Sequence, residues 1–240
     1  MNNYVIYLRG INVGGKNKIK MADLRLVLDA AGFNQVKTYI QSGNIVLQSS
    51  LSCTEITSQL ESLLVQNFEL DSKLVRVLAL EHSLYQKIIE EAPKTFGDNT
   101  AEIDYRYEVM FLIGVTSDEV MKEVAIREEI DRVWQGSYAV YYRRPGPKHP
   151  DYTKSALSRI IKKPIYQSIT MRNWRTTMKM NELLNTGSII FSVVTKKISN
   201  NTNFLYNKKA FVSFIIKLDT KIKGENKCFN TKISKLKIKI

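Results

Sequence analysis

The chain has 240 residues, of which 44% are hydrophobic and 10% aromatic, enough for a globular protein with a buried core. It contains no run of 18 apolar residues, so we expect no membrane partner, and its two distant cysteines make no disulfide framework. The first residues, MNNYVIYLRG, lack the basic start and small-residue cleavage site of a signal peptide, which predicts a cytoplasmic location.

The formal net charge of +13 is unevenly distributed along the chain. Residues 1–186 contain 24 basic and 21 acidic side chains, whereas residues 187–240 contain 12 lysines and 2 acidic side chains. Basic proteins attract phosphate backbones, but here most of the charge belongs to the C-terminal segment. Nucleic acid is therefore an unlikely partner for the first 186 residues, although the charge does not exclude it.

The first third of the chain follows one alternating pattern. In chain order we expect a strand at 4–8, a helix at 21–33, strands at 36–40 and 45–48 joined by a QSGN turn, a helix at 53–68 and a strand at 74–80. Ser52 and Glu55 have the spacing of a capping box, which favours a helix start at that point.

The second half is less regular. Its expected elements are a helix at 82–92, a linker, a strand at 105–113, a charged amphipathic helix at 117–134, a strand at 138–143, and helices at 153–161 and 171–184. The order βαββαβ of the first part is that of a ferredoxin-like unit. We therefore predict an α/β (α+β) protein with tandem ferredoxin-like units at 1–93 and 100–186, followed by a tail at 187–240.

A resemblance to a known family rests on three segments, namely YVIYLRGINVGGKNKIKMADLRLVLDAAGF (residues 4–33), VKTYIQSGNIVL (36–47) and ITMRNWRTTMKMNELL (169–184). Over roughly residues 3–184 the chain is similar to the bacterial family called domain of unknown function 1697. The resemblance implies a two-unit, ferredoxin-related α/β fold and implies no activity. Members that resemble this chain usually end soon after the last of these segments, so the tail departs from the family pattern.

The loop at residues 10–17, GINVGGKN, nearly matches the phosphate-binding pattern G-x-x-x-x-G-K-[ST]. Asn17 replaces the hydroxyl that would bind Mg²⁺, the next helix begins late, near Met21, and the following strands form a hairpin, so we do not expect nucleotide hydrolysis. Two interpretations stay open: a basic loop that binds an anion, and a tight connection whose glycines supply positive φ.

A second interpretation of the first unit is an RNA-recognition domain, which has the same element order. Alternation would place Tyr7 and Arg9 beside Tyr39 and Gln41 on the outer sheet face, where aromatic rings could stack on bases. The third strand lacks the aromatic residues of such domains, and a second unit would bury this face equally well. We favour packing.

The segment at 170–184 predicts a helix capped by Thr170, with an apolar stripe of Met171, Trp174 and Met178. Arg172, Thr176 and Lys179 would lie on the opposite face, where they either complete a site with the first loop or contact solvent. Together with the loop and the QSGN turn, the candidate ligand-binding residues are Arg9, Gly10, Asn12, Gly14, Gly15, Lys16, Asn17, Lys18, Gln41, Ser42, Asn44, Arg172, Asn173 and Lys179.

No set of residues predicts catalysis. His82 and His149 have no partners at metal-ligand spacing, and His149 is expected to face solvent. Cys53 near a helix start would be reactive if its pKa were lowered, and inert if buried. Carboxylates such as Asp131 are expected on the solvated face of the charged helix. Whether the protein is an enzyme thus stays open, and no pattern identifies a metal, a cofactor or an oligomeric state.

The tail is rich in Ile, Lys, Asn and Phe and has no Arg, Pro or Trp. Its apolar stretches at 188–194 and 210–216 and its alternating end at 235–240 are compatible with strands, although we expect little order. We interpret it as read-through or frameshifted sequence. For residues 1–186 we expect a protein that binds a small anionic, phosphorylated or nucleotide-like ligand at its glycine-rich loop; the alternative is a protein- or RNA-interaction module without catalytic activity.

Overall fold

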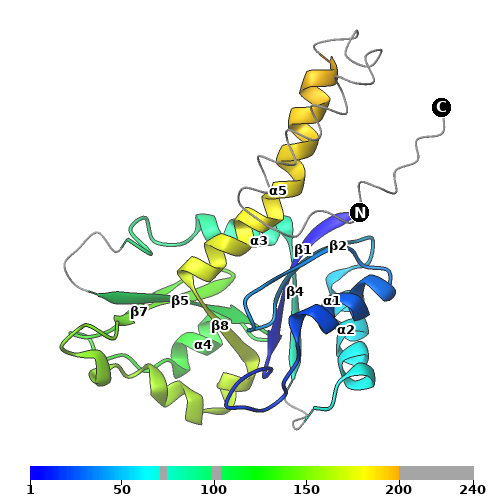
Figure 1. Cartoon of the computed structure of the whole chain (residues 1–240). Helices are drawn as coiled ribbons and strands as arrows, with labels where there is room; N and C mark the ends of the chain where they lie inside the picture. The colour runs from blue at the N-terminus through cyan, green and yellow to red at the C-terminus, as the bar shows by residue number, and fades with distance from the viewer. Residues whose placement is uncertain (71–74, 99–103, 200–240) are drawn as a thin grey trace, which may run out of the picture. The chain divides into compact units, whose positions relative to one another are not determined.

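The computed structural model describes residues 1–70, 75–98 and 104–199, the last thirteen of them by their backbone alone. The chain divides into two compact units, Met1–Thr186 and Gly187–Ile240. The first unit is a mixed α/β structure with two four-stranded antiparallel sheets and helices packed on them (Figure 1). In the part of the chain that is described, no helix is both long enough and apolar enough to cross a membrane.

The first sheet has the strand order β2-β3-β1-β4, and all neighbouring strands are antiparallel. Its elements are β1 (Asn2–Arg9), α1 (Met21–Ala30), β2 (Asn34–Tyr39), β3 (Asn44–Ser49), α2 (Cys53–Asn67) and β4 (Arg76–Glu81). The expected elements are present, with strand ends shifted by one or two residues. Residue 74, the expected start of the last strand, lies outside the described residues.

The central strand β1 is buried on both faces, which explains its continuous apolar run. Val5 pairs with Val46 on one side and with Leu80 on the other. The capping box at the start of α2 is confirmed, because the Ser52 side chain accepts from the Glu55 backbone N–H while the Glu55 carboxylate accepts from Ser52.

The second sheet has the order β6-β7-β5-β8 and is also antiparallel throughout. Its elements are α3 (His82–Glu90), β5 (Tyr105–Leu112), α4 (Ser117–Glu123), β6 (Arg132–Gln135), β7 (Ala139–Pro145), three 3₁₀ turns η1 (Tyr152–Lys154), η2 (Leu157–Lys162) and η3 (Pro164–Ser168), β8 (Ile169–Asn173) and α5 (Trp174–Ser199). The expected helix at 153–161 is thus wrong: that stretch forms two short 3₁₀ turns.

The expected charged helix at 117–134 is also wrong, because α4 ends at Glu123 and the chain returns as strand β6. Asp131, expected on a solvated face, is buried and accepts hydrogen bonds from the backbone N–H groups of Arg127 and Ala156 and from the Ser155 hydroxyl. An aspartate that can bond the backbone locally competes with helix continuation, and the charge pattern does not reveal this competition.

The helix expected at 171–184 begins three residues later. Residues 169–173 pair with β5 as the edge strand β8, and the Asn173 side chain, rather than Thr170, caps α5 by accepting from the Thr176 N–H. The predicted apolar stripe holds only in part: Met171 and Trp174 pack against the cores, whereas Met178 is 39% exposed. The buried positions of α5 are Thr176, Thr177, Met180 and Leu184, so the expectation that Thr176 contacts a ligand or solvent is wrong. Pairing with β5 overrides the helical periodicity of this segment.

Residues 188–194, whose apolar sequence is compatible with a strand, instead continue the helix α5. The stretch contains no proline, and an existing helix extends into such a sequence with one new hydrogen bond per residue. The other two tail segments considered as strands, 210–216 and 235–240, lie outside the described residues.

The two sheets share a core between them. Residues on one face of the first sheet pack with α1 and α2, whereas Val5, Tyr7 and Leu80 on its other face pack with Phe111 and Tyr141 of the second sheet. Figure 1 shows α1 and α2 on the far side of β1 and β4 from the second sheet. The helices α3 and α5 close this core with residues from each. The face on which RNA-recognition domains stack bases is therefore used for packing, as expected.

Candidate functional site

The glycine-rich connection between β1 and α1 folds as a tight projecting turn. Val13 and Lys16 form a β-bridge, with the Lys16 N–H donating to the Val13 carbonyl at 3.1 Å. The turn between them has positive φ at both central glycines, Gly14 at 59° and Gly15 at 78°, as the mirror-image hairpin turns require. Gly10, Asn12 and Asn17 also have positive φ.

The two asparagines hold this loop in shape. Asn12 Nδ2 donates to the carbonyls of Ile19 at 3.0 Å and Gln41 at 2.7 Å, and Asn12 Oδ1 accepts from the Ile19 N–H at 2.9 Å. Asn17 is buried, and its Nδ2 donates to the Gly10 carbonyl at 2.8 Å. Asparagine tolerates the left-handed region and satisfies its own backbone there. Asn12 and Asn17 are both among the predicted ligand-binding residues, but their side chains already hydrogen-bond the protein backbone.

The outer surface of the loop is basic. Lys16, Lys18 and Lys20 are exposed, and across the described residues none of them forms an ion pair. Val13 at the tip is 69% exposed. A Cβ built on either glycine of the turn would meet nothing within 4 Å, so the backbone here is open to an approaching group.

Two features that separate this loop from a nucleotide-hydrolysing loop are present as expected. The helix α1 begins only at Met21, with Lys20 in the capping position and no side-chain cap, so its N-terminus does not abut Gly14 and Gly15. The strands after it, β2 and β3, form an antiparallel hairpin rather than a parallel crossover.

The QSGN turn lies against the same end of β1. Asn44 is buried, and its Nδ2 donates to the Tyr39 carbonyl and the Ser42 hydroxyl at 3.0 and 2.9 Å. Gly43 has φ +69°, and a Cβ at this position would lie 2.6 Å from Leu8 Cβ. The Asn12–Gln41 bond connects this turn to the glycine-rich loop.

Arg172 of β8 joins the QSGN turn to the second half. Its guanidinium donates to Asn44 Oδ1 at 2.6 Å, to the Leu8 carbonyl at 2.9 Å and to the Ser42 carbonyl at 3.1 Å. It also donates to Thr170 Oγ1 and the Met171 carbonyl, and it lies 4.7 Å from the centre of the Tyr7 ring. Burial lowers the pKa of Arg172, because desolvation disfavours the charged form.

Arg9 makes a second connection from the end of β1. Its Nε donates to the Ile169 carbonyl at 3.0 Å and its Nη2 to the Tyr166 carbonyl at 3.1 Å. The guanidinium lies 5.1 Å from the centre of the Tyr166 ring. Burial lowers the pKa of Arg9. Both arginines therefore hold the two halves together by donating hydrogen bonds to backbone carbonyls, and Arg172 also donates to side-chain oxygens.

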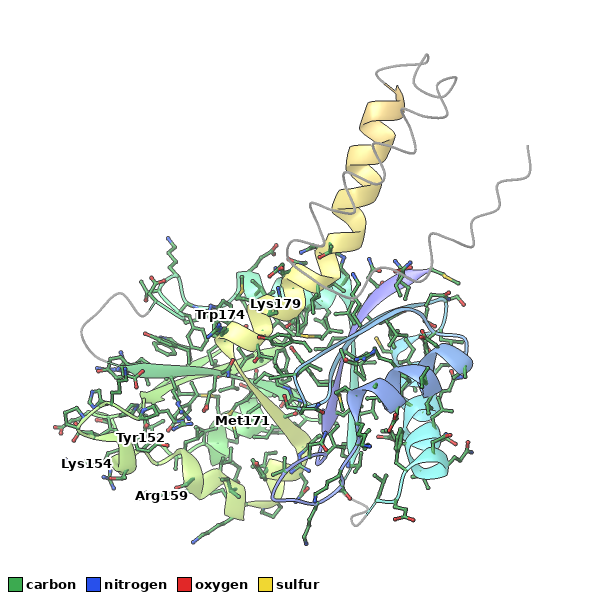
Figure 2. The ribbon with its side chains drawn as sticks, viewed as in Figure 1. Tyr152, Lys154, Arg159, Met171, Trp174 and Lys179 are labelled. Atoms are coloured by element: carbon green, nitrogen blue, oxygen red, sulfur yellow. The ribbon has the colours of Figure 1, made fainter. Side chains whose placement is uncertain are left out.

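Two predicted site residues lie elsewhere. Asn173 caps α5, and the Lys179 ammonium pairs with Glu182 at 2.7 Å. Lys179 lines a separate surface cavity of about 560 Å³ with Tyr39 and other residues of α5. Figure 2 shows Lys179 on α5 near Trp174. The structure thus brings together the loop, the QSGN turn and Arg172, and leaves Asn173 and Lys179 apart from the loop.

The structure decides the expectations about two further residues, Cys53 and His149. Burial raises the pKa of the Cys53 thiol, which supports the buried, inert alternative over the reactive one. The His149 side chain, expected in solvent, is only 12% exposed because it packs on the Tyr105 ring, and its Nδ1 accepts from the Asp151 N–H. The burial of Cys53 and the contacts of His149 depend on the folded structure, so the neighbouring residues in the sequence do not indicate them.

Sequence reasoning missed one central residue, Phe96 of the expected linker. It is buried, and its ring meets those of Tyr107, Trp134, Tyr141 and Trp174 at centroid distances of 5.1 to 5.8 Å. The only available signal was a lone aromatic residue between polar neighbours, which by itself does not distinguish a buried ring from an exposed one.

These features define the class of protein: a two-sheet α/β protein with a rigid, basic, glycine-rich loop at the junction of its halves. The chain belongs to the family described as Protein of unknown function (DUF1697), whose model matches residues 1–142. The family resemblance stated from the sequence is thereby confirmed. A search of curated proteins finds no match.

One solved structure is similar over most of the first unit. It is a conserved bacterial protein from Streptococcus pneumoniae, with 28% sequence identity and a TM-score of 0.64. The match covers 76% of this chain and 98% of that one. It supports the mixed α/β architecture with two sheets.

Proposed function

We propose that the protein binds an anionic ligand, such as a phosphate ester, on the outer surface of the glycine-rich loop. The single observation that carries the proposal is that the side chains which hold the loop in shape are different from those which project to solvent. Asn12 and Asn17 hold its shape from within, whereas Lys16 and Lys18 project to solvent beside an open Gly14–Gly15 backbone. A preorganised loop loses little conformational entropy when a ligand binds.

Arg9 and Arg172 act in this proposal as positioning residues. Each guanidinium donates to carbonyl groups of the neighbouring half or turn. They would therefore reach a ligand only by giving up these bonds. The contact with an anion is assigned to the lysines and to backbone N–H groups at the tip.

The test is a binding titration of the full chain with inorganic phosphate, ATP and polyphosphate, followed by isothermal calorimetry at two salt concentrations. The double variant Lys16→Ala/Lys18→Ala should bind at least one probe about thirtyfold more weakly, since the two lost contacts with phosphate remove roughly 1 kcal/mol each. A matched control is Lys94→Ala/Lys122→Ala, which removes two exposed lysines elsewhere. The lysine-rich tail is present in every variant, so nonspecific binding cancels. Equal affinities of the two double variants would refute the proposal.

A second candidate is an interaction module that uses the same surface for a macromolecule. It is favoured by the exposed apolar side chains near the loop, Val13 at 69% and Ile40 at 53%. Saturable binding of a small probe supports the first candidate. Binding only to proteins or RNA, lost in Val13→Ser and retained in Lys16→Ala/Lys18→Ala, would support the second.

We also propose that both halves are ferredoxin-like units. In support, the strand orders β2-β3-β1-β4 and β6-β7-β5-β8 place equivalent strands at equivalent positions, with η1–η3 where the first half has α2. The protein would then have a duplicated fold. Separately, we propose that it is a bacterial protein of the cytoplasm. A structure comparison that superimposes the two halves strand for strand tests the duplication, and cell fractionation tests the location.

A further inference from the structure

A cavity of about 890 Å³ lies far along the chain from the glycine-rich loop, and neither the proposed function nor the family assigns it a role. It is bounded by the ends of β4 and β5, by α3, by the start of α4 and by the turn between β6 and β7. Its volume is in the range of small-molecule sites.

The floor of this cavity is apolar. Leu80, Ile88 and Phe111 are almost completely buried and belong to the core between the sheets. Leu84 and Val115 extend the apolar wall toward the surface. Because Leu84 and Val115 are only half-buried, they are the apolar surface on which the apolar part of a ligand would pack.

Although the protein as a whole is basic, the rim of the cavity is acidic. Its charged side chains are Glu91 and Asp118, and no lysine, arginine or histidine is among the described residues that line the cavity. The chain as a whole carries +13. An acidic mouth on a basic protein favours a cation over an anion by local attraction.

Glu91 is held rigidly by neutral donors. Its carboxylate accepts from the N–H groups of Ser137 and Tyr138 at 2.8 and 3.1 Å and from the Tyr141 hydroxyl at 3.0 Å. A Cβ on Gly136 would lie 2.4 Å from Glu91 Oε1, so the turn needs glycine to admit the carboxylate. Neutral donors leave the negative charge of the carboxylate uncompensated.

Asp118, at the start of α4, also lines the cavity, and its Oδ1 accepts from the Gln135 amide. It is not used to cap α4, because the Thr116–Glu119 capping box already engages that helix start. No ion pair to Glu91 or Asp118 occurs within the described parts of the chain. Two carboxylates on the rim therefore lack a cation.

Tyr138 adds an aromatic face to the rim. It is 42% exposed, and the Lys87 ammonium lies 5.8 Å from its ring centre. This contact shows that the ring accepts a cation from the solvent side. Lys87 itself does not line the cavity. A ligand cation at the cavity mouth would therefore be a second positive charge near Tyr138, on the side where Glu91 and Asp118 lie.

We propose that this cavity binds a small organic cation: a primary amine carried on an apolar body about the size of a phenyl or cyclohexyl ring. The apolar body packs on Leu84 and Val115, and the ammonium is attracted to the Glu91 and Asp118 carboxylates and to Tyr138 at the rim. This binding is independent of the loop lysines.

The experiment uses the full chain and three probes of similar size: 2-phenylethylamine, 2-phenylethanol and 3-phenylpropionate. Binding is measured by saturation-transfer NMR and calorimetry at pH 7. The amine should bind saturably and about tenfold more tightly than the alcohol, because two protein carboxylates attract its ammonium group. The acid should bind most weakly, because the same carboxylates repel it. Equal binding of amine and acid, or no binding of the amine at millimolar concentration, overturns the proposal.

Variants locate the binding. Asp118→Asn should weaken amine binding about fivefold and leave alcohol binding unchanged, because only a charge contact is removed. Glu90→Gln, an exposed neighbour on α3 outside the lining, is the matched control and should have no effect. Leu84→Trp should weaken binding of both the amine and the alcohol, because the larger indole occupies the wall on which their rings pack. Equal effects of Asp118→Asn and Glu90→Gln, or unchanged binding in Leu84→Trp, contradict the assignment. Amine binding should also persist in Lys16→Ala/Lys18→Ala, which separates this proposal from the anion site.

Discussion

Replacing Arg172 by methionine should destabilise the protein without altering its fold. Methionine has a similar length but no donor, so the Leu8 and Ser42 carbonyls and the Asn44 side-chain oxygen lose the guanidinium that now bonds them. These three bonds cross from the second half to the first. The substitution therefore tests whether Arg172 holds the halves together.

The magnitude follows from the contacts. Three buried hydrogen bonds from a charged donor contribute about 4.5 kcal/mol at roughly 1.5 kcal/mol each. The stacking on Tyr7 contributes about 1 kcal/mol more. The buried guanidinium pairs with no carboxylate among the described residues, so removing its desolvation cost offsets about 2 to 3 kcal/mol. We expect a net loss of about 3 kcal/mol, or roughly 9 °C in melting temperature for a protein of this size.

The assay is urea unfolding of the full chain followed by far-UV circular dichroism and tryptophan fluorescence. Both tryptophans, Trp134 and Trp174, pack against the core between the sheets and report on its disruption. Arg175→Met is the matched control, because Arg175 is an exposed residue of α5, and it should change stability by less than about 0.5 kcal/mol. An Arg172→Met variant as stable as this control would refute the assigned role.

The remaining predictions concern single sites. Gly43→Ala should cost about 2 kcal/mol or more in thermal unfolding, because its φ is +69° and its Cβ would lie 2.6 Å from a side-chain carbon of β1; Gly14→Ala, with open space around it, should cost about 1 kcal/mol. Phe96→Ala should cost about 3 kcal/mol in urea titrations, since four aromatic neighbours lose their contact, and a loss below about 1 kcal/mol would disprove the packing role. Cys53 should react with iodoacetamide at pH 8 about tenfold more slowly in the folded than in the urea-unfolded chain, with the other cysteine replaced by serine, because burial raises its pKa and reduces the thiolate fraction; equal rates would contradict this.

Much of the local structure could be predicted because its causes lie within a few residues. The capping box at Ser52, the apolar run of β1 and the late start of α1 at Met21 all follow from neighbouring side chains. The errors arose where a distant partner decided the outcome. Asp131, expected on a helix face, is buried and bonds the distant Ala156, and residues 169–173 pair with β5 although their spacing favours a helix.

The candidate site divides in the same way. The sequence by itself determined the basic, glycine-rich loop and its need for positive φ, because Gly and Asn tolerate that conformation at Gly14, Gly15 and Asn17. Only the tertiary structure decided which polar groups are already engaged. Arg172 and Leu8 are bonded although they are 164 positions apart, and no local pattern indicates such a contact. The acid-rimmed cavity likewise arises from residues of five separate elements and turns, since burial and charge pairing depend on packing rather than on sequence neighbours.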